Sequence, residues 1–310
     1  MESREFFFPS SDGKTQLRAV EWLPEGEARA VLQICHGVSE YILRYEDFAR
    51  FLTENGFAVV GHDHLSHGAS IAEGAPPLYF GKRGSWDFVI RDIEARRALA
   101  RERFPNVPYF LLGHSMGSFA ARTYLLRYPS RVDGAILMGT GQMGKGLLAA
   151  GRALTTLACL FGEAKPSPLI NAIAFGPYDR PFAPNRTAFD WLSANEENVD
   201  RYIADPLCGG VVSAGLFREM LAGIAEITNG KNLQAMDKST PILFISGAMD
   251  PVGDCSAGVK RAYESFLRAG CTDVMLTLYD GLRHEILQER EKETVYADLL
   301  AWLTAHFPAP

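Results

Sequence analysis

The chain has 310 residues, of which 47% are hydrophobic, and this length and composition support a large buried core. Its formal net charge is −6 and no basic stripe offsets it, which argues against nucleic acid as a partner. The five cysteines are odd in number, widely spaced and free of C-x-x-C patterns. We therefore expect reduced thiols, no structural disulfide and a cytoplasmic protein.

Short apolar runs alternate with segments of helical period, a pattern typical of a parallel sheet with crossover helices. The aromatic run at residues 6–8 predicts a first strand, and the N-terminus lacks the basic and apolar regions of a signal peptide. Further strands are expected at residues 17–22, 30–35, 57–62, 109–113, 134–139, 242–247 and 274–279. Helices are expected at residues 45–55, 85–104, 115–128, 257–269 and 292–306. No segment reaches the ~18 uninterrupted apolar residues of a membrane span.

A segment of about 100 residues between the strands near residues 139 and 241 shows no strand periodicity and is far longer than a crossover needs. We therefore expect a core of residues 1–140 and 236–310 with an inserted helical cap at 141–235. Apolar side chains of the cap are candidates for the lining of an acyl tunnel. The stretch 147–161 is open to two interpretations, a membrane-facing surface or ordinary packing within the cap.

The pentapeptide Gly113-His114-Ser115-Met116-Gly117 follows an apolar run and opens a segment of helical period. This G-x-S-x-G pattern is typical of a nucleophile elbow, in which a sharp strand-to-helix turn exposes the serine hydroxyl. The backbone N–H groups that follow lie at a helix N-terminus, where partial positive charge suits a developing oxyanion. Ser115 is thus the candidate nucleophile for acyl transfer.

A carboxylate and a histidine follow in the order Ser, Asp, His that this architecture uses. Asp250 lies in the loop after the strand at 242–247, and His284 lies after the strand at 274–279. His284 is the candidate general base, and Asp250 would fix its tautomer and stabilise the imidazolium. Asp254 and Asp280 remain alternatives for the carboxylate.

Three motifs together carry a family resemblance: residues 36–45, which begin His36-Gly37-Val38, residues 62–70, and the elbow. In order and spacing they look like the monoacylglycerol lipase and lysophospholipase branch of the α/β-hydrolases. The resemblance implies an α/β-hydrolase fold with an inserted helical cap. It also implies an oxyanion hole made by the backbone N–H groups of Val38 and Met116. Ser66 replaces a glycine usual in the family, and Tyr41 replaces a common histidine.

Four histidines cluster in the loops before the elbow: His36, His62, His64 and His67. We expect them to hydrogen-bond the backbone and hold the oxyanion loop. The spacing His62-x-His64-x-x-His67 also fits a metal site, but nearby paired carboxylates are missing and a serine elbow needs no metal. We therefore expect neither a metal nor a cofactor.

These features predict a serine hydrolase that cleaves carboxylic esters, with a monoacylglycerol or lysophospholipid as the first hypothesis. A small-molecule carboxylesterase, a thioesterase or an amidase would use the same residues. A catalytically silent ligand-binding protein on this fold is the alternative from another class. The expected partner is a small acyl ester, with peripheral membrane contact through the cap as a further hypothesis, and the sequence leaves the oligomeric state open.

Overall fold

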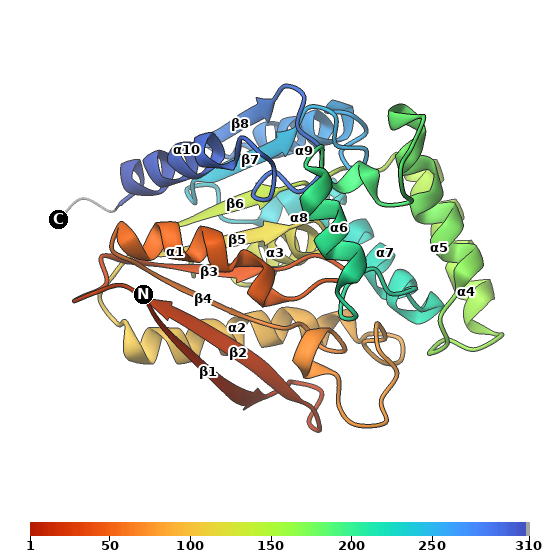
Figure 1. Cartoon of the computed structure of the whole chain (residues 1–310), viewed down its shortest axis with the longest axis horizontal. Coiled ribbons are helices and arrows are strands. Elements are labelled where there is room, and N and C mark those ends of the chain that lie inside the picture. Colours follow the sequence, from red (N-terminus) through yellow and green to blue (C-terminus); the bar gives the residue numbers. More distant parts are fainter. Residues whose placement is uncertain (308–310) are drawn as a thin grey trace.

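The computed structural model describes residues 1–307, and an eight-stranded sheet forms its centre (Figure 1). Its strands, in the order β1-β2-β4-β3-β5-β6-β7-β8, are β1 (Glu2–Pro9), β2 (Gln16–Leu23), β4 (Phe57–His62), β3 (Ala30–Cys35), β5 (Tyr109–His114), β6 (Gly134–Met138), β7 (Ile242–Gly247) and β8 (Val274–Tyr279). The β1–β2 and β2–β4 pairs are antiparallel, and all other pairs are parallel. Every strand expected from the sequence is present, including the first. The inner parallel strands are buried on both faces, which is why they appear as continuous apolar runs.

Helices cover both faces of the sheet. On one face lie α1 (Glu46–Glu54) and α10 (Lys292–Ala305), and on the other lie α2 (Trp86–Arg103), α3 (Met116–Arg127) and α9 (Ala257–Ala269). In α1 the buried side chains Phe48, Ala49 and Leu52 recur at three- to four-residue spacing, so one stripe packs on the strands. The five helices expected from the sequence therefore occur within a few residues of their expected bounds. This arrangement is the α/β-hydrolase fold.

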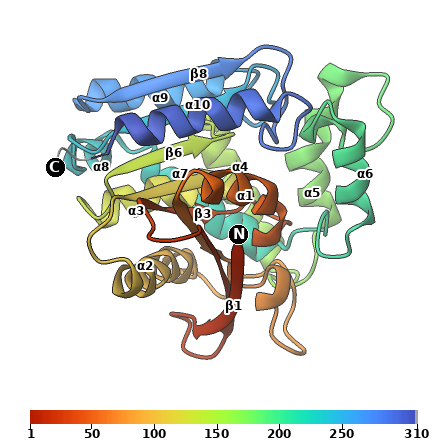
Figure 2. The ribbon, with the colours of Figure 1, turned by 60° about the vertical axis from the view of Figure 1, so that its left-hand side comes forward.

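The segment between β6 and β7 is helical. It contains α4 (Lys145–Cys159), α5 (Pro168–Phe175), α6 (Glu196–Ala204), α7 (Ala214–Ile227) and α8 (Gly230–Ala235), with 3-10 turns at Gly176–Phe182 and Asp190–Leu192. In two views α5 and α6 lie beyond one end of the sheet, where the parallel strands finish (Figures 1 and 2). Helix α7 contacts both α4 and α3, so it joins this segment to the rest of the molecule. Within residues 1–307 no helix combines the length and apolar character needed to cross a bilayer.

Candidate active site

Ser115 occupies the tight turn between β5 and α3. Its backbone has φ 53° and ψ −120°, a strained combination for a residue with a side chain. The Ser115 N–H donates to the Met138 carbonyl of β6 at 3.0 Å, which anchors the turn against the neighbouring strand. At Gly117 a Cβ atom would lie 2.0 Å from the Cys35 carbonyl oxygen, so only glycine allows α3 to approach β3 this closely.

Asp250 and His284 come from the loops after two neighbouring strands, β7 and β8, and their side chains meet. His284 Nδ1 lies 2.9 Å from Asp250 Oδ2, and both side chains are almost completely buried. Asp250 also accepts hydrogen bonds from the Ser246 hydroxyl at 3.2 Å and from the Val252 N–H at 2.9 Å. With Nδ1 directed at the carboxylate, Nε2 is the imidazole nitrogen left for proton transfer.

The two other carboxylates considered from the sequence do not pair with His284. Asp254 binds Arg261 at 2.9 Å and its side chain is 67% exposed. Asp280 lies in the exposed turn after β8. Of the three, only Asp250 has the contact that an orienting acid requires.

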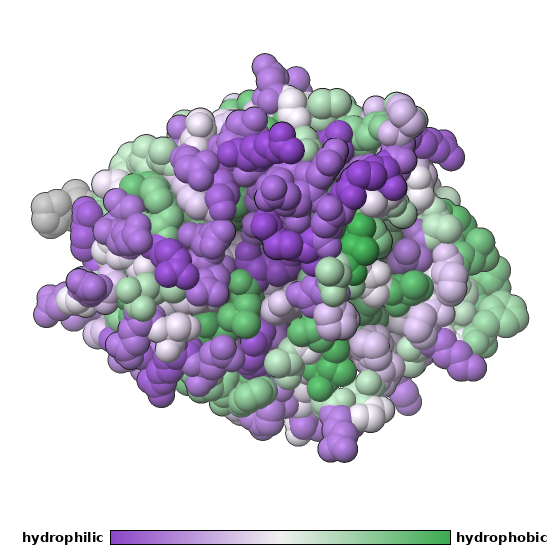
Figure 3. Space-filling model, viewed as in Figure 1, coloured by the Kyte–Doolittle hydropathy of each residue, from purple (hydrophilic) through white to green (hydrophobic). Residues whose placement is uncertain are grey.

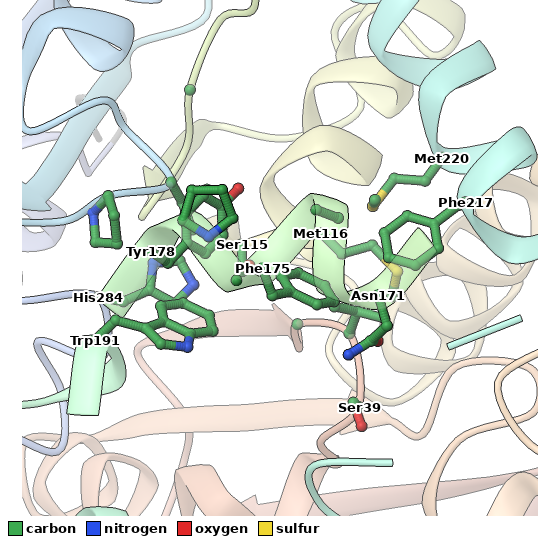
Figure 4. Close-up of a pocket in the computed structure, with 18 of the residues that line it drawn as sticks. Ser39, Ser115, Met116, Asn171, Phe175, Tyr178, Trp191, Phe217, Met220 and His284 are labelled. Atoms are coloured by element: carbon green, nitrogen blue, oxygen red, sulfur yellow. The ribbon is translucent and has the colours of Figure 1, made fainter. Parts of the chain in front are cut away.

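Ser115 and His284 line one cavity of about 710 Å³, and both lie on its wall in Figure 4. The hydrogen bonds within residues 1–307 do not include one from the Ser115 hydroxyl to His284, although His284 is held by Asp250. Such contacts between catalytic groups are often long before substrate binds and shorten in the complex. The arrangement is therefore compatible with nucleophilic catalysis by Ser115.

Residues between β6 and β7 make most of the cavity wall apolar. The apolar side chains come from α4, α5, α7 and the turn at Asp190–Leu192, and they include Leu154, Phe175, Trp191, Phe217, Met220, Leu221 and Ile224. Figure 4 shows Phe175, Trp191, Phe217 and Met220 around the cavity. Trp191 lies against the His284 ring, with ring centroids 5.2 Å apart. A site with this lining favours an extended apolar group beside the serine.

The two N–H groups expected to form the oxyanion hole come from the loop after β3 and from the start of α3. Met116 is the first residue of α3, and the first N–H groups of a helix have no intrahelical acceptor. Val38 follows Gly37, where a Cβ atom would come within 3.1 Å of the Ser115 Cβ. This close approach suits donors that must reach an oxygen on a carbon bonded to the serine.

Sequence reasoning missed a buried group of polar side chains behind these loops. Glu40 Oε1 accepts hydrogen bonds from the Gly37 N–H at 2.5 Å and the Tyr45 hydroxyl at 2.9 Å, and lies 3.0 Å from His114 Nδ1. The His114 ring in turn packs on the His284 ring at 4.6 Å between centroids. The only local signal was a carboxylate three residues after Gly37.

Charges in this group shift the titration of its members. Burial would raise the pKa of Glu40, but the hydrogen bond with His114 and the positive charge of Arg44 outweigh burial and hold that pKa well below its usual range. Burial would lower the pKa of His114, but the hydrogen bond and negative charge of Glu40 raise it overall. The pair therefore favours its charged form.

The four clustered histidines only partly match expectation. His36 Nε2 accepts the His64 backbone N–H at 2.9 Å, and His67 Nδ1 lies 3.0 Å from the Leu65 carbonyl oxygen. The ring nitrogens of His62 and His64 have no hydrogen-bond partner among residues 1–307, so the expected backbone bonds from these two rings are wrong. Across all the residues that the structure describes, no group of three or more His, Cys, Asp or Glu side chains is arranged to hold a metal ion.

Comparison with known proteins indicates the same class of protein as the fold and the elbow do, the serine hydrolases. The family model described as serine aminopeptidase, S33 matches residues 26–291, so the chain belongs to this family of serine hydrolases on the α/β-hydrolase fold. Monoglyceride lipase of Homo sapiens is 29% identical over 287 residues, covering 91% of this chain and 85% of the relative. Monoacylglycerol lipase of Mycolicibacterium smegmatis is 28% identical over 290 residues, covering 92% and 91%.

Solved structures are also similar. A thermostable carboxyl esterase from Bacillus coagulans, in complex with glycerol, superposes with a TM-score of 0.90 at 25% identity, covering 98% of this chain and 99% of the esterase. A lipase in an open form gives a TM-score of 0.89 at 28% identity, with the same coverage. Together with the family match, these relatives identify a serine ester hydrolase.

Proposed function

We propose that this protein hydrolyses single-chain carboxylic esters, a monoacylglycerol or a lysophospholipid, through an acyl-enzyme on Ser115. The observation that carries the proposal is the apolar cavity of about 710 Å³ that has Ser115 on its wall. A single acyl chain gains free energy from burial along such a wall, by up to ~0.8 kcal/mol for each methylene enclosed. The names of the two lipase relatives support the same substrate class.

In the proposed mechanism the Ser115 hydroxyl attacks the acyl carbon while His284 Nε2 takes its proton. The negative charge that develops on the carbonyl oxygen is held by the N–H groups of Val38 and Met116. His284 then protonates the leaving alcohol, and a water molecule activated by the same imidazole hydrolyses the acyl-enzyme. Asp250 stays ionised and stabilises the imidazolium in both halves of the reaction.

A small-molecule carboxylesterase is the main alternative, and a thioesterase or amidase would use the same residues. A short acyl group would leave most of the apolar cavity unfilled, which is why we favour a longer chain. A catalytically silent binding protein would not need the Asp250–His284 contact, which serves to orient an imidazole for proton transfer.

We further propose that residues 1–140 and 236–307 form the core and that residues 141–235 form a cap that contacts membrane lipid. Residues 308–310, which were also expected in the core, lie outside the described residues. Leu160 and Phe161, which directly follow α4, are 77% and 81% exposed, and Leu169 and Ile173 of α5 are 67% and 50% exposed. Apolar surface is visible at the right-hand edge of Figure 3, where Figure 1 has α4 and α5. These helices also line the cavity, so a lipid substrate would have a short route from a membrane to Ser115.

Two measurements test the proposal. A fluorophosphonate probe should label the wild type at Ser115 and should not label Ser115→Ala, because only an activated serine reacts with it. Lengthening an ester from two to eight acyl carbons should raise kcat/KM by about three orders of magnitude if every added methylene is enclosed. Highest activity on acetyl esters, falling with chain length, would instead support the small-ester alternative.

Membrane contact is tested separately by flotation with phosphatidylcholine vesicles. Replacing Leu160 and Phe161 with serine should reduce the bound fraction and leave hydrolysis of a water-soluble short ester unchanged. Equal flotation of the variant and the wild type would contradict the proposed membrane contact.

A further inference from the structure

The guanidinium of Arg44 joins the loop of His284 to the loop of the proposed oxyanion hole. Arg44 Nη1 and Nη2 donate to the two carboxylate oxygens of Glu285 at 2.6 and 2.7 Å. The same Nη1 donates to Glu40 Oε2 at 2.7 Å. Glu285 directly follows His284, and Glu40 holds the backbone N–H of Gly37. One side chain thereby connects two loops that are some 240 positions apart in the sequence.

The charged side chains of this cluster are buried, so each needs its partners to compensate its charge. The side chain of Arg44 is 11% exposed, and those of Glu40 and Glu285 are each 4% exposed. Loss of one partner leaves a buried charge poorly compensated, which is costly in a medium of low polarity. The bidentate contact with Glu285 also fixes the orientation of the guanidinium. A lysine ammonium could not form this planar, bidentate contact.

The cap contributes to the same cluster. Asn198 of α6 donates from Nδ2 to Glu285 Oε2 at 2.7 Å. The Glu285 backbone N–H donates to the Leu192 carbonyl oxygen, also at 2.7 Å. Glu285, the residue after His284, is thus held through its side chain by Arg44 and Asn198. Its main chain is held by Leu192.

From these contacts we propose that Arg44 and Glu285 are positioning residues that keep His284 in register with the oxyanion loop. The inference rests on the proposed function, because it assigns a task to residues around the proposed base. Its physical basis is the sensitivity of catalysis to geometry, since a displacement of about 1 Å in a reacting group can reduce the rate by ~100-fold. Arg44 and Glu285 act through the loops that they hold and take no part in bond making or breaking.

The test is Arg44→Lys, which keeps the positive charge and removes the planar fork. We expect kcat to fall by about 10- to 100-fold while KM changes by less than about 3-fold, because register is lost and substrate binding is not. Arg50→Lys is the matched control. Arg50 forms an exposed pair with Glu46 on α1, with the two side chains 53% and 47% exposed, and its replacement should leave kcat unchanged.

A second pair of variants gives a graded comparison. Glu285→Gln keeps the shape and one acceptor oxygen, so it should retain more of kcat than Glu285→Ala. If Arg44→Lys does not fold, the ratio of kcat between these two variants decides the inference. Equal kcat in Glu285→Ala and the wild type would overturn it.

The rate of fluorophosphonate labelling at Ser115 distinguishes this inference from the proposed function. Slower labelling of Arg44→Lys at an unchanged Tm supports a positioning role. If Arg44 only stabilised the fold, its replacement would lower the Tm and leave the labelling rate of the folded protein unchanged. Labelling at the wild-type rate by a folded Arg44→Lys variant overturns the inference and leaves the proposed Ser115 nucleophile intact. Failure of the wild type to be labelled overturns the proposed function, and this inference with it.

Discussion

Stability should fall steeply in mild acid because four histidines are buried and their burial disfavours the charged form. Burial lowers the pKa of His36 to about 4 and that of His67 to about 3, against an ordinary value of 6.5. Burial also lowers the pKa values of His62 and His64 well below 6.5. Below pH 6.5 these histidines bind protons in the unfolded chain but stay neutral in the folded protein until the pH is much lower. The stability present at neutral pH is therefore lost as the pH falls from 6.5 towards 4.

The magnitude follows from proton linkage. At pH 5.5, one unit below the ordinary pKa, each such histidine lowers the free energy of unfolding by up to about 1.4 kcal/mol, and four of them lower it by up to about 5.6 kcal/mol. The raised pKa of His114 acts in the opposite direction, since it adds stability that is fully present below pH 6.5, and offsets part of this loss. The remainder is comparable with the whole unfolding free energy of many domains, about 5–15 kcal/mol.

The assay is urea unfolding, followed by tryptophan fluorescence, at pH 7.5 and 5.5. His62→Phe removes one titrating ring whose two nitrogens have no partner among residues 1–307. The difference in unfolding free energy between the two pH values should therefore shrink, by up to about 1.4 kcal/mol. Phe8→Leu is the matched control. The Phe8 ring packs edge-on against His62 at 5.5 Å, so this variant should lose stability equally at both pH values. An unfolding free energy that is the same at pH 7.5 and 5.5 in the wild type would refute the reasoning.

Four further outcomes are expected. Asp250→Asn should lower kcat by about 10²- to 10⁴-fold with the circular dichroism spectrum unchanged, and a loss of that size in Asp254→Asn instead would move the acid role there. Ester turnover by the Ser115→Ala, His284→Ala double variant should be no lower than that of either single variant, whereas additive losses would show that the two act separately. Gly117→Ala should destabilise the fold by about 3 kcal/mol or more, seen as a lower Tm, because its Cβ would meet the backbone of β3. Ester hydrolysis should continue in EDTA, whereas inactivation by EDTA that zinc reverses would support the hypothesis of a metal site at the clustered histidines.

The sequence by itself determined the features that depend on neighbouring residues. Buried parallel strands need unbroken apolar runs, and the elbow needs a serine at a strand-to-helix turn with a glycine two residues before it and another two residues after it. The strands around Ser115 and the helix after it were therefore predictable to within a residue or two. The long segment without strand periodicity also predicted the helical region between β6 and β7, because no simple crossover requires that length.

Only the tertiary structure decided which distant side chains meet. Asp250, Asp254 and Asp280 were all candidates, and the packing of β7 beside β8 puts Asp250 alone against His284. The contact between Arg44 and Glu285 had no local signal, because it joins loops from opposite ends of the chain. The position of the histidines in loops after strands also suggested hydrogen bonds that the rings of His62 and His64 do not make among residues 1–307. Periodicity encodes which face of an element is buried, whereas the partner of a buried polar group depends on how all the elements pack together.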